Sequence, residues 1–75
     1  MTDKRIIAFI GGGNMATSLI GGLVEAGWDP AAIAVAEPDA ERRRELVDRF
    51  GVQAEEEAYR VVGGKDIVVL AVKPQ

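Results

Sequence analysis

Residues 6–16 of this 75-residue chain read Ile-Ile-Ala-Phe-Ile-Gly-Gly-Gly-Asn-Met-Ala, and this stretch decides the fold. Five consecutive apolar residues lead directly into three glycines, and a helical pattern starts immediately after them. An apolar run that ends at glycines is typical of a strand buried on both faces, as in parallel sheets. We therefore expect a strand over residues 6–10 and a helix that begins at residue 14.

The glycines after this strand fit the pattern G-x-G-x-x-G/A, which forms the turn that binds a dinucleotide pyrophosphate. Gly11 permits a tight turn, Gly13 lets the backbone approach a phosphate, and Ala16 lets the helix pack closely on the strand. The amides of the first helical turn and the helix dipole add partial positive charge. Asn14 can cap this helix or contact the cofactor. The alternative is a strand-to-helix turn that binds no ligand.

Composition excludes several classes of function. The chain has no cysteine and no histidine, which excludes a disulfide framework, zinc binding through thiolates and the commonest general acid–base side chain. A net charge of −3 without a basic cluster argues against nucleic acid as the main partner. The apolar run after Arg5 is too short for a signal peptide or a membrane span. We therefore expect a cytoplasmic protein that binds neither nucleic acid nor membranes.

Strand-like and helix-like segments alternate along the chain. Their predicted order is strand 6–10, helix 14–27, strand 33–36, helix 41–50, strand 52–54, helix 55–62 and strand 67–72. This alternation predicts a partial Rossmann-like three-layer α/β fold, with a parallel sheet in βαβαβαβ order. The sequence stops just after the last strand, so we expect residues 1–75 to be the amino-terminal part of a dinucleotide-binding domain within a longer protein.

Local signals predict where the helices begin, end and pack. Asp29 and Asp39 are suitable N-caps, Gly27 stands where a left-handed C-terminal cap is expected, and Gly51 should end the helix over 41–50. The helix over 14–27 carries a wide apolar face that should cover the sheet, made of Met15, Ala16, Leu19, Ile20, Leu23 and Val24.

Residues that bind the adenosine end of a dinucleotide follow the second strand. Glu37 lies 24 residues after Gly13, where an acidic residue typically binds the ribose 2′-hydroxyl of NAD and repels the 2′-phosphate of NADP. Arg42, Arg43 and Arg44 follow within one helical turn, and an arginine accommodates that phosphate. A solvated helix face, paired with Glu41, Glu45 and Asp48, is the better explanation for at least two of the three arginines. The residues alone leave the choice between NADPH and NADH open.

Lys73 stands at the carboxyl end of the most hydrophobic strand. Ligands of open α/β sheets lie outside the carboxyl ends of the strands, so a lysine there can reach a ribose or a phosphate. A solvated lysine at a strand end is the alternative. The sequence offers no convincing general acid, base or nucleophile, and we assign no catalytic residue and no metal ligand.

Three segments resemble the amino-terminal third of bacterial pyrroline-5-carboxylate reductases, namely residues 9–16, 19–23 and 69–75. That family opens with a Phe-Ile-Gly-x-Gly-Asn-Met turn and closes its fourth strand with Ala-Val-Lys-Pro, often followed by glutamine. The pairing of these two motifs is more specific than either alone, and the similarity covers essentially all of the chain. One departure is Ala58, where many members carry an asparagine that helps to hold the adenosine side.

The resemblance implies reduction of 1-pyrroline-5-carboxylate to proline, the last step of proline synthesis, with NADPH as the expected cofactor and NADH as the second candidate. The glycine turn would lie under the pyrophosphate, and the end of the fourth strand would lie beside the nicotinamide. The residues thus assigned to the cofactor are Ile10, Gly11, Gly12, Gly13, Asn14, Met15, Glu37, Arg42, Ala71, Val72, Lys73 and Pro74. The family's substrate pocket and dimerising helices lie in its carboxyl-terminal part, so the small-molecule substrate and a homo-oligomer are expected of the longer protein.

Two other interpretations stay open. Dehydrogenases of the 3-hydroxyacid or 6-phosphogluconate type share a similar turn, but they usually have glycine where this chain has Ala16, and they lack the Val-Lys-Pro-Gln ending. A nucleotide-sensing module without catalysis would use the same turn. A methyltransferase that uses S-adenosylmethionine normally has an acidic residue just before the first glycine, whereas residues 8–10 here are apolar.

Overall fold

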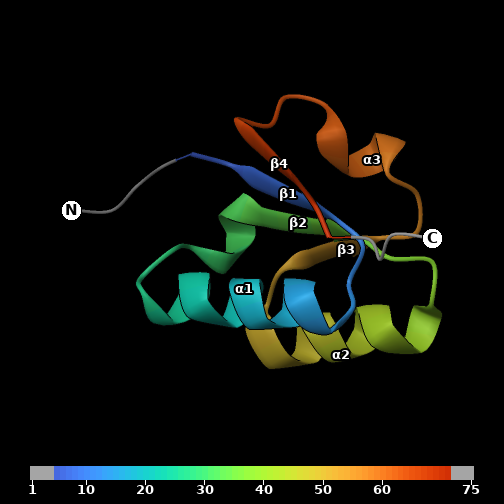
Figure 1. Ribbon diagram of the computed structural model, residues 1–75, viewed down its shortest axis with the longest axis horizontal. Helices are drawn as coiled ribbons and strands as arrows, with labels where there is room; N and C mark the ends of the chain where they lie inside the picture. Colours follow the sequence, from blue (N-terminus) through green and yellow to red (C-terminus); the bar gives the residue numbers. More distant parts are fainter. Residues whose placement is uncertain (1–4, 72–75) are drawn as a thin grey trace.

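The structure, a computed structural model, describes residues 5–71. Within this range the chain forms a parallel sheet with helices on both faces (Figure 1). The elements in chain order are β1 (Ile7–Ile10), α1 (Asn14–Glu25), the 3₁₀ turn η1 (Pro30–Ala32), β2 (Ile33–Ala36), α2 (Ala40–Phe50), β3 (Gln53–Glu55), α3 (Tyr59–Val62) and β4 (Ile67–Leu70). Of the helices in this range, none is long and apolar enough to cross a bilayer.

The strands lie in the order β3-β2-β1-β4, and every neighbouring pair is parallel. The chain therefore moves outward from β1 through β2 to β3, and then crosses back to place β4 on the other side of β1. Ile7 is in register with Ile33 on one side and with Ile67 on the other. This reversal of direction beside β1 is where open α/β sheets bind their ligands, outside the carboxyl ends of the strands. The predicted Rossmann-like α/β fold is confirmed.

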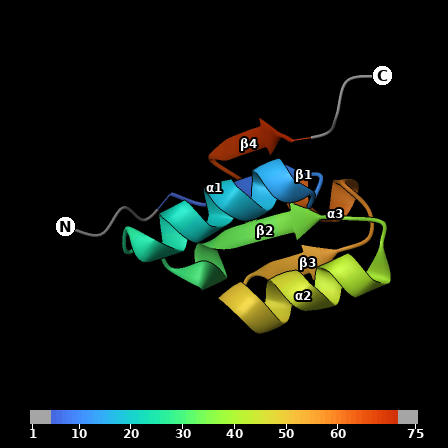
Figure 2. The same ribbon diagram turned by 60° about the horizontal axis from the view of Figure 1, so that its bottom comes forward.

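The two faces of the sheet carry side chains of different size. Helices α1 and α2 lie on one face and α3 on the other, which gives the predicted three layers (Figure 2). The larger buried side chains pack toward α1 and α2, and they are Ile7, Phe9, Ile20, Ile33, Val35 and Leu46. The opposite face of β1 and β2 presents alanines, and Val61 of α3 packs against Ala8, Ala34 and Ala36. Full burial of one large side chain such as Phe9 contributes about 1.5–3 kcal/mol. The layer between the sheet and helices α1 and α2 therefore contributes most of the packing energy.

The predicted cap residues stand at the ends of the helices, as expected. Asp29 Oδ1 accepts a hydrogen bond from the Ala31 amide at 2.9 Å, and Asp39 Oδ1 accepts one from the Glu41 amide at 3.0 Å. Gly51 ends α2 in the left-handed conformation with φ +75°. These short-range predictions are confirmed because each depends only on residues a few positions apart.

The predicted helix over residues 55–62 is wrong in its first half. Glu55 is the last residue of β3, and the helix covers only Tyr59–Val62. The Glu37 amide donates to the Glu55 carbonyl at 2.8 Å, so pairing with the chain beyond β2 keeps residue 55 extended. Ala58 and Val62, which the helical pattern placed inward, are exposed, and Val61 alone of the three is buried.

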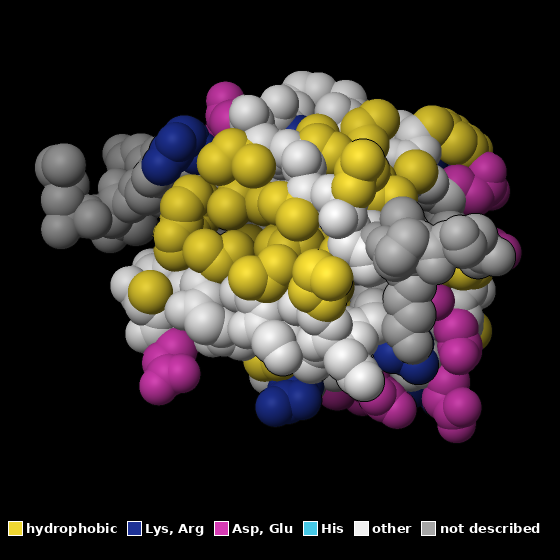
Figure 3. All heavy atoms as spheres, viewed as in Figure 1, with side chains coloured by type: hydrophobic (Ala, Val, Ile, Leu, Met, Phe, Trp, Pro, Cys, Tyr) yellow, Lys and Arg dark blue, Asp and Glu magenta, His cyan; other side chains and the backbone are white. Residues whose placement is uncertain are grey.

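β4 is the most hydrophobic strand, yet it lies at the edge of the sheet that the structure describes. Val68 is 46% exposed and Leu70 is 72% exposed. The apolar run predicts burial on both faces, but the strand order leaves β4 with a single described neighbour, β1. Hydrophobic side chains accordingly gather over the part of the surface formed by β1 and β4 in Figure 3. The predicted end of the strand at Val72 lies outside the described residues.

Candidate functional site

The loop from β1 to α1 turns sharply at Gly11. This residue has φ +102°, a conformation that L-amino acids with a side chain rarely adopt. Its amide donates to the Ala36 carbonyl of β2 at 2.8 Å, so the turn begins at the carboxyl ends of the two central strands. The tight turn predicted at Gly11 is confirmed, and it leads the chain directly into α1.

Gly12 is held by packing that the motif does not specify. It is buried, and a Cβ added to it would lie 2.9 Å from Leu46 Cδ1 and 3.1 Å from Glu37 Cβ. Separations this short exclude a side chain unless the neighbouring residues move. The glycine-x-glycine pattern leaves this position open, so sequence reasoning missed the constraint. The run of three glycines was the only signal of it.

Gly13 is the N-cap of α1, and no side chain caps this helix. The capping role considered for Asn14 is therefore not found, because Asn14 is itself the first helical residue. The Gly13 carbonyl accepts both the amide and the hydroxyl of Thr17, each at 2.9 Å. Amides of a first helical turn have no partner within their own helix, and the dipole makes this end attractive to anions.

Among the described residues, one cation lies beside Gly13. A Cβ added to Gly13 would meet Arg42 Nη1 at 3.9 Å and, outside the adjacent chain, no other described atom within 4 Å. Arg42 comes from the first turn of α2 and is exposed, and it lines a small hollow between α1 and α2 together with Asn14 and Thr17. The structure thus brings one of the three predicted arginines to the glycine loop.

Arg43 has a different place. Its Nη1 donates to the Glu37 carbonyl at 2.7 Å and to the Pro38 carbonyl at 2.9 Å. These bonds hold Arg43 to the backbone of the turn between β2 and α2. Neighbouring arginines of one helical turn therefore differ in role: Arg43 supports the turn, and Arg42 lies beside the loop.

The Glu37 carboxylate is buried, with 9% of the residue exposed, and both of its oxygens are hydrogen-bonded. Oε1 accepts from the Gly12 amide at 2.8 Å, and Oε2 accepts from the Asp39 amide at 2.9 Å. The residue that the sequence placed near the adenosine ribose therefore lies directly against the glycine loop. The sequence spacing predicted that Glu37 lies near the cofactor site, but it did not predict these two hydrogen bonds.

The end of β4 meets the start of the loop. Ala71 is buried, and its amide donates to the Ile10 carbonyl at 2.8 Å. Ile10, Gly11 and Ala71 are thus brought together at the carboxyl edge of the sheet. Val72, Lys73 and Pro74, also predicted to bind the cofactor, lie outside the described residues.

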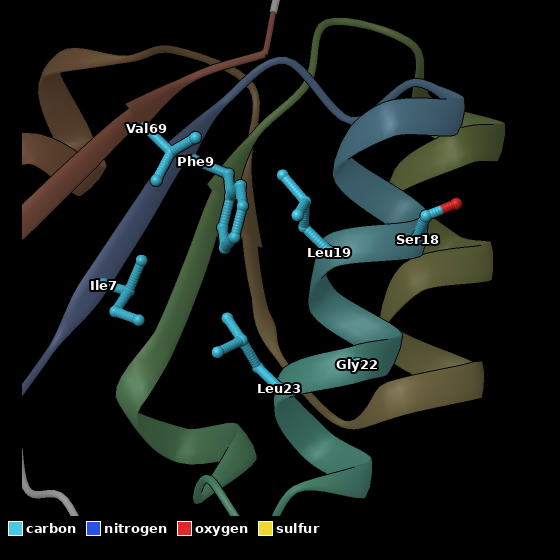
Figure 4. A pocket seen from close by; sticks show the side chains of 7 residues that line it. All are labelled: Ile7, Phe9, Ser18, Leu19, Gly22, Leu23 and Val69. Atoms are coloured by element: carbon cyan, nitrogen blue, oxygen red, sulfur yellow. The ribbon is translucent and has the colours of Figure 1, made fainter.

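A second hollow, of about 420 Å³, lies between α1 and the sheet (Figure 4). Its lining comes from β1, β4 and α1 and consists of Ile7, Phe9, Ser18, Leu19, Gly22, Leu23 and Val69. Leu19 is 45% exposed beside it, and Met15 is 57% exposed near the start of the helix. The apolar face of α1 covers the sheet as predicted: Ala16 and Ile20 are fully buried, and Leu23 and Val24 pack against the core. This almost wholly apolar groove cannot bind a pyrophosphate.

The site at the carboxyl edge can therefore bind an anion and orient it. Within residues 5–71 it combines the open N-terminus of α1, a glycine whose Cβ position has Arg42 as its one neighbour, and one buried carboxylate. A diphosphate with a ribose on one side fits these groups, because amides and a guanidinium bind phosphate oxygens and a carboxylate accepts hydroxyls.

Comparisons with known proteins agree with this geometry. Residues 6–75 match a protein family described as NADP oxidoreductase coenzyme F420-dependent. The chain is 48% identical over 75 residues to a pyrroline-5-carboxylate reductase of Pseudomonas aeruginosa, and 42% identical over 72 residues to that of Escherichia coli. A solved structure of a pyrroline-5-carboxylate reductase from Coxiella burnetii superposes with a TM-score of 0.92 at 36% identity, over 96% of this chain. The chain spans about a quarter of each of these proteins, 27% in all three cases.

Proposed function

The chain belongs to the family described as NADP oxidoreductase, coenzyme F420-dependent, and we propose that it forms the amino-terminal, dinucleotide-binding part of a pyrroline-5-carboxylate reductase. The longer protein would reduce 1-pyrroline-5-carboxylate to proline. The observation that carries the proposal is the open N-terminus of α1 at the end of the central strand, reached through a turn that requires glycine at Gly11 and Gly12. The names of the relatives favour a reductase over a nucleotide-sensing module.

The proposed cofactor position follows from the groups around the loop. The pyrophosphate lies on the backbone of residues 11–15, where the helix dipole and the unpaired amides favour an anion. The open space beside Gly13 supports this position, since a ligand can approach the backbone there. The adenosine ribose lies toward Glu37 and Arg42. The nicotinamide lies beside Ile10 and Ala71, with Val72, Lys73 and Pro74 as further predicted contacts.

NADPH is the proposed hydride donor, with NADH as the second candidate. The exposed guanidinium of Arg42 is available to pair with a 2′-phosphate, because it does not share the backbone contacts that hold Arg43. Glu37 opposes a 2′-phosphate through its charge. Each of its oxygens, however, already accepts a backbone amide, so the carboxylate is engaged with the loop and turn backbone.

In this proposal the residues of the site bind and orient the cofactor, and no proton transfer is assigned to any of residues 5–71. When bound, the nicotinamide cofactor supplies the hydride. The glycine loop would fix the cofactor along the carboxyl edge of the sheet, and the hydrogen bond from the Ala71 amide to the Ile10 carbonyl would fix the strand ends beside which the ring lies. The substrate pocket, the homo-oligomer and the cytoplasmic location of the longer protein belong to the same proposal.

A side-by-side calorimetric titration with NADPH and NADH tests the proposal. We expect saturable binding of at least one of the two. Tighter binding of NADPH would show that Arg42 determines the preference at the ribose, and tighter binding of NADH would show that Glu37 does. Adenosine alone, which lacks the pyrophosphate, should bind far more weakly. The absence of binding by either dinucleotide would refute the proposed function.

A further inference from the structure

One carboxylate joins the two loops at the carboxyl edge of the sheet. Glu37 Oε1 accepts the buried amide of Gly12, in the loop after β1. Glu37 Oε2 accepts the amide of Asp39, in the turn after β2. The same Asp39 caps α2 through the Glu41 amide, so the carboxylate connects the glycine loop to a turn that is itself fixed.

Gly12 is restrained on its other side by packing. Leu46 Cδ1 lies 2.9 Å from the position that a Cβ of Gly12 would occupy. The hydrogen bond to Glu37 therefore holds the Gly12 amide, and the Leu46 side chain limits the space beside the Gly12 Cα. Gly12 directly precedes the N-cap Gly13, and its orientation sets the direction in which α1 begins.

We infer that Glu37 is a positioning residue of the glycine loop: its carboxylate holds Gly12 and thereby orients the first-turn amides of α1. The inference rests on the proposed function, because those amides are the proposed pyrophosphate site. It differs from a contact between Glu37 and the ribose 2′-hydroxyl, which would act on the adenosine alone. A residue that acts through the loop affects every dinucleotide, whatever group stands at the ribose 2′ position.

The substitution Glu37→Gln separates these roles. A glutamine side chain keeps the length of Glu37 but has one uncharged acceptor oxygen and one donor nitrogen. The Gly12 amide therefore either loses its acceptor or keeps a weaker, neutral one, and its resonance changes in both cases. Asp29→Asn is the matched control. Asp29 also accepts a backbone amide, that of Ala31, but it lies before the amino end of β2, at the opposite edge of the sheet.

The first readout is binding of NADH, of NADPH and of an NADH analogue that lacks the adenosine 2′-hydroxyl. We expect Glu37→Gln to weaken NADH and the deoxy analogue by the same factor, about tenfold, as for the loss of one hydrogen bond to a charged group. Asp29→Asn should leave both affinities unchanged. If the variant weakens NADH and leaves the deoxy analogue unaffected, Glu37 is a ribose ligand and the inference is refuted.

The second readout is the Gly12 amide in ¹H–¹⁵N NMR spectra of the ligand-free protein. In Glu37→Gln this resonance should shift and exchange faster with solvent, whereas in Asp29→Asn it should stay in place. An unchanged Gly12 amide in Glu37→Gln would refute the inference even if binding were weaker. Should this variant not fold, Glu37→Asp, which keeps the charge but withdraws the carboxylate by one methylene group, takes its place with the same expectations.

The two proposals fail in different ways. Wild-type protein that binds neither NADH nor NADPH would refute the proposed function, and the inference with it. Wild-type protein that binds, alongside a Glu37→Gln variant with unchanged affinity for all three ligands, would refute the inference alone.

Discussion

The Glu37 carboxylate and the Gly12 amide are 25 residues apart in the sequence and 2.8 Å apart in the structure. This bond is buried, and it lies where the ends of β1 and β2 meet. A carboxylate that bonds backbone amides at this edge determines the shape of the loop as well as the charge of the site. The conformation of the glycine loop therefore depends on contacts with the end of β2 as well as on its own sequence.

Substitution of Gly12 by alanine should lower the free energy of unfolding by about 1–3 kcal/mol, because the added Cβ overlaps Leu46 and Glu37. Chemical denaturation followed by circular dichroism measures the loss. Gly22→Ala is the control, since Gly22 lies in the interior of α1 and a Cβ added there meets no described atom within 4 Å outside its own helix. It should raise stability by about 0.5–1 kcal/mol, as alanine is the better helix former. Equal effects at the two glycines would contradict the packing described for Gly12.

Gly13→Val should abolish dinucleotide binding and leave the fold intact. Among residues 5–71, Arg42 Nη1 at 3.9 Å is the one atom beyond the adjacent chain that a Cβ of Gly13 would meet, so the valine side chain would fill the space proposed for a phosphate. A small loss of stability, below about 1 kcal/mol, is expected because valine is a poorer N-cap than glycine. Calorimetric titration and thermal unfolding of the same sample separate binding from folding. Unchanged affinity for NADPH and NADH would place the pyrophosphate elsewhere.

Much of the fold could be predicted because its signals are local. The apolar run before Gly11 determines β1, and Asp29, Asp39 and Gly51 bound their helices within a few residues. Alternation of these elements then determines a parallel sheet. What could not be predicted depends on contacts between distant residues. Glu55 is extended rather than helical because the chain beyond β2 pairs with it.

The candidate site divides in the same way. The turn at Gly11 follows from the motif, and the general place of Glu37 follows from its spacing. The difference between Arg42 and Arg43 does not, because it depends on how α2 lies against the β2–α2 turn and the loop. The packing of Gly12 against Leu46 is likewise a contact between separate elements, and no pattern of either segment encodes it.

The 75-residue chain by itself should show no reductase activity. Within residues 5–71, the groups of the candidate site are proposed to bind a dinucleotide, and no proton transfer is assigned to any of them. The chain also spans only 27% of its reductase relatives. An assay that follows NADPH and NADH oxidation in the presence of 1-pyrroline-5-carboxylate checks this expectation. Turnover above that of the Gly13→Val variant would contradict it and would place the catalytic groups in this part of the protein.

Two leucines should respond very differently to the same substitution. Leu46 is 2% exposed and packs in the layer between the sheet and α2, whereas Leu70 is 72% exposed on the edge strand β4. Leu46→Ala should cost about 2–5 kcal/mol, since it removes buried methyl groups and leaves a cavity. Leu70→Ala should cost less than about 1 kcal/mol, since the side chain loses little packing and only some strand propensity.

The pair also tests the contact between Leu46 and Gly12. In a double-mutant cycle, Gly12→Ala should cost less when Leu46 is already alanine, because the closest clash, with Leu46 Cδ1, has been removed. Glu37 Cβ and Cγ stay within 3.1–3.2 Å of the new methyl group, so part of the cost should persist. Strict additivity of the two substitutions would mean that the loop is not packed on α2. In that case hydrogen bonds of the loop backbone, from Gly12 to Glu37 and from Gly11 to Ala36, would hold the loop without help from α2.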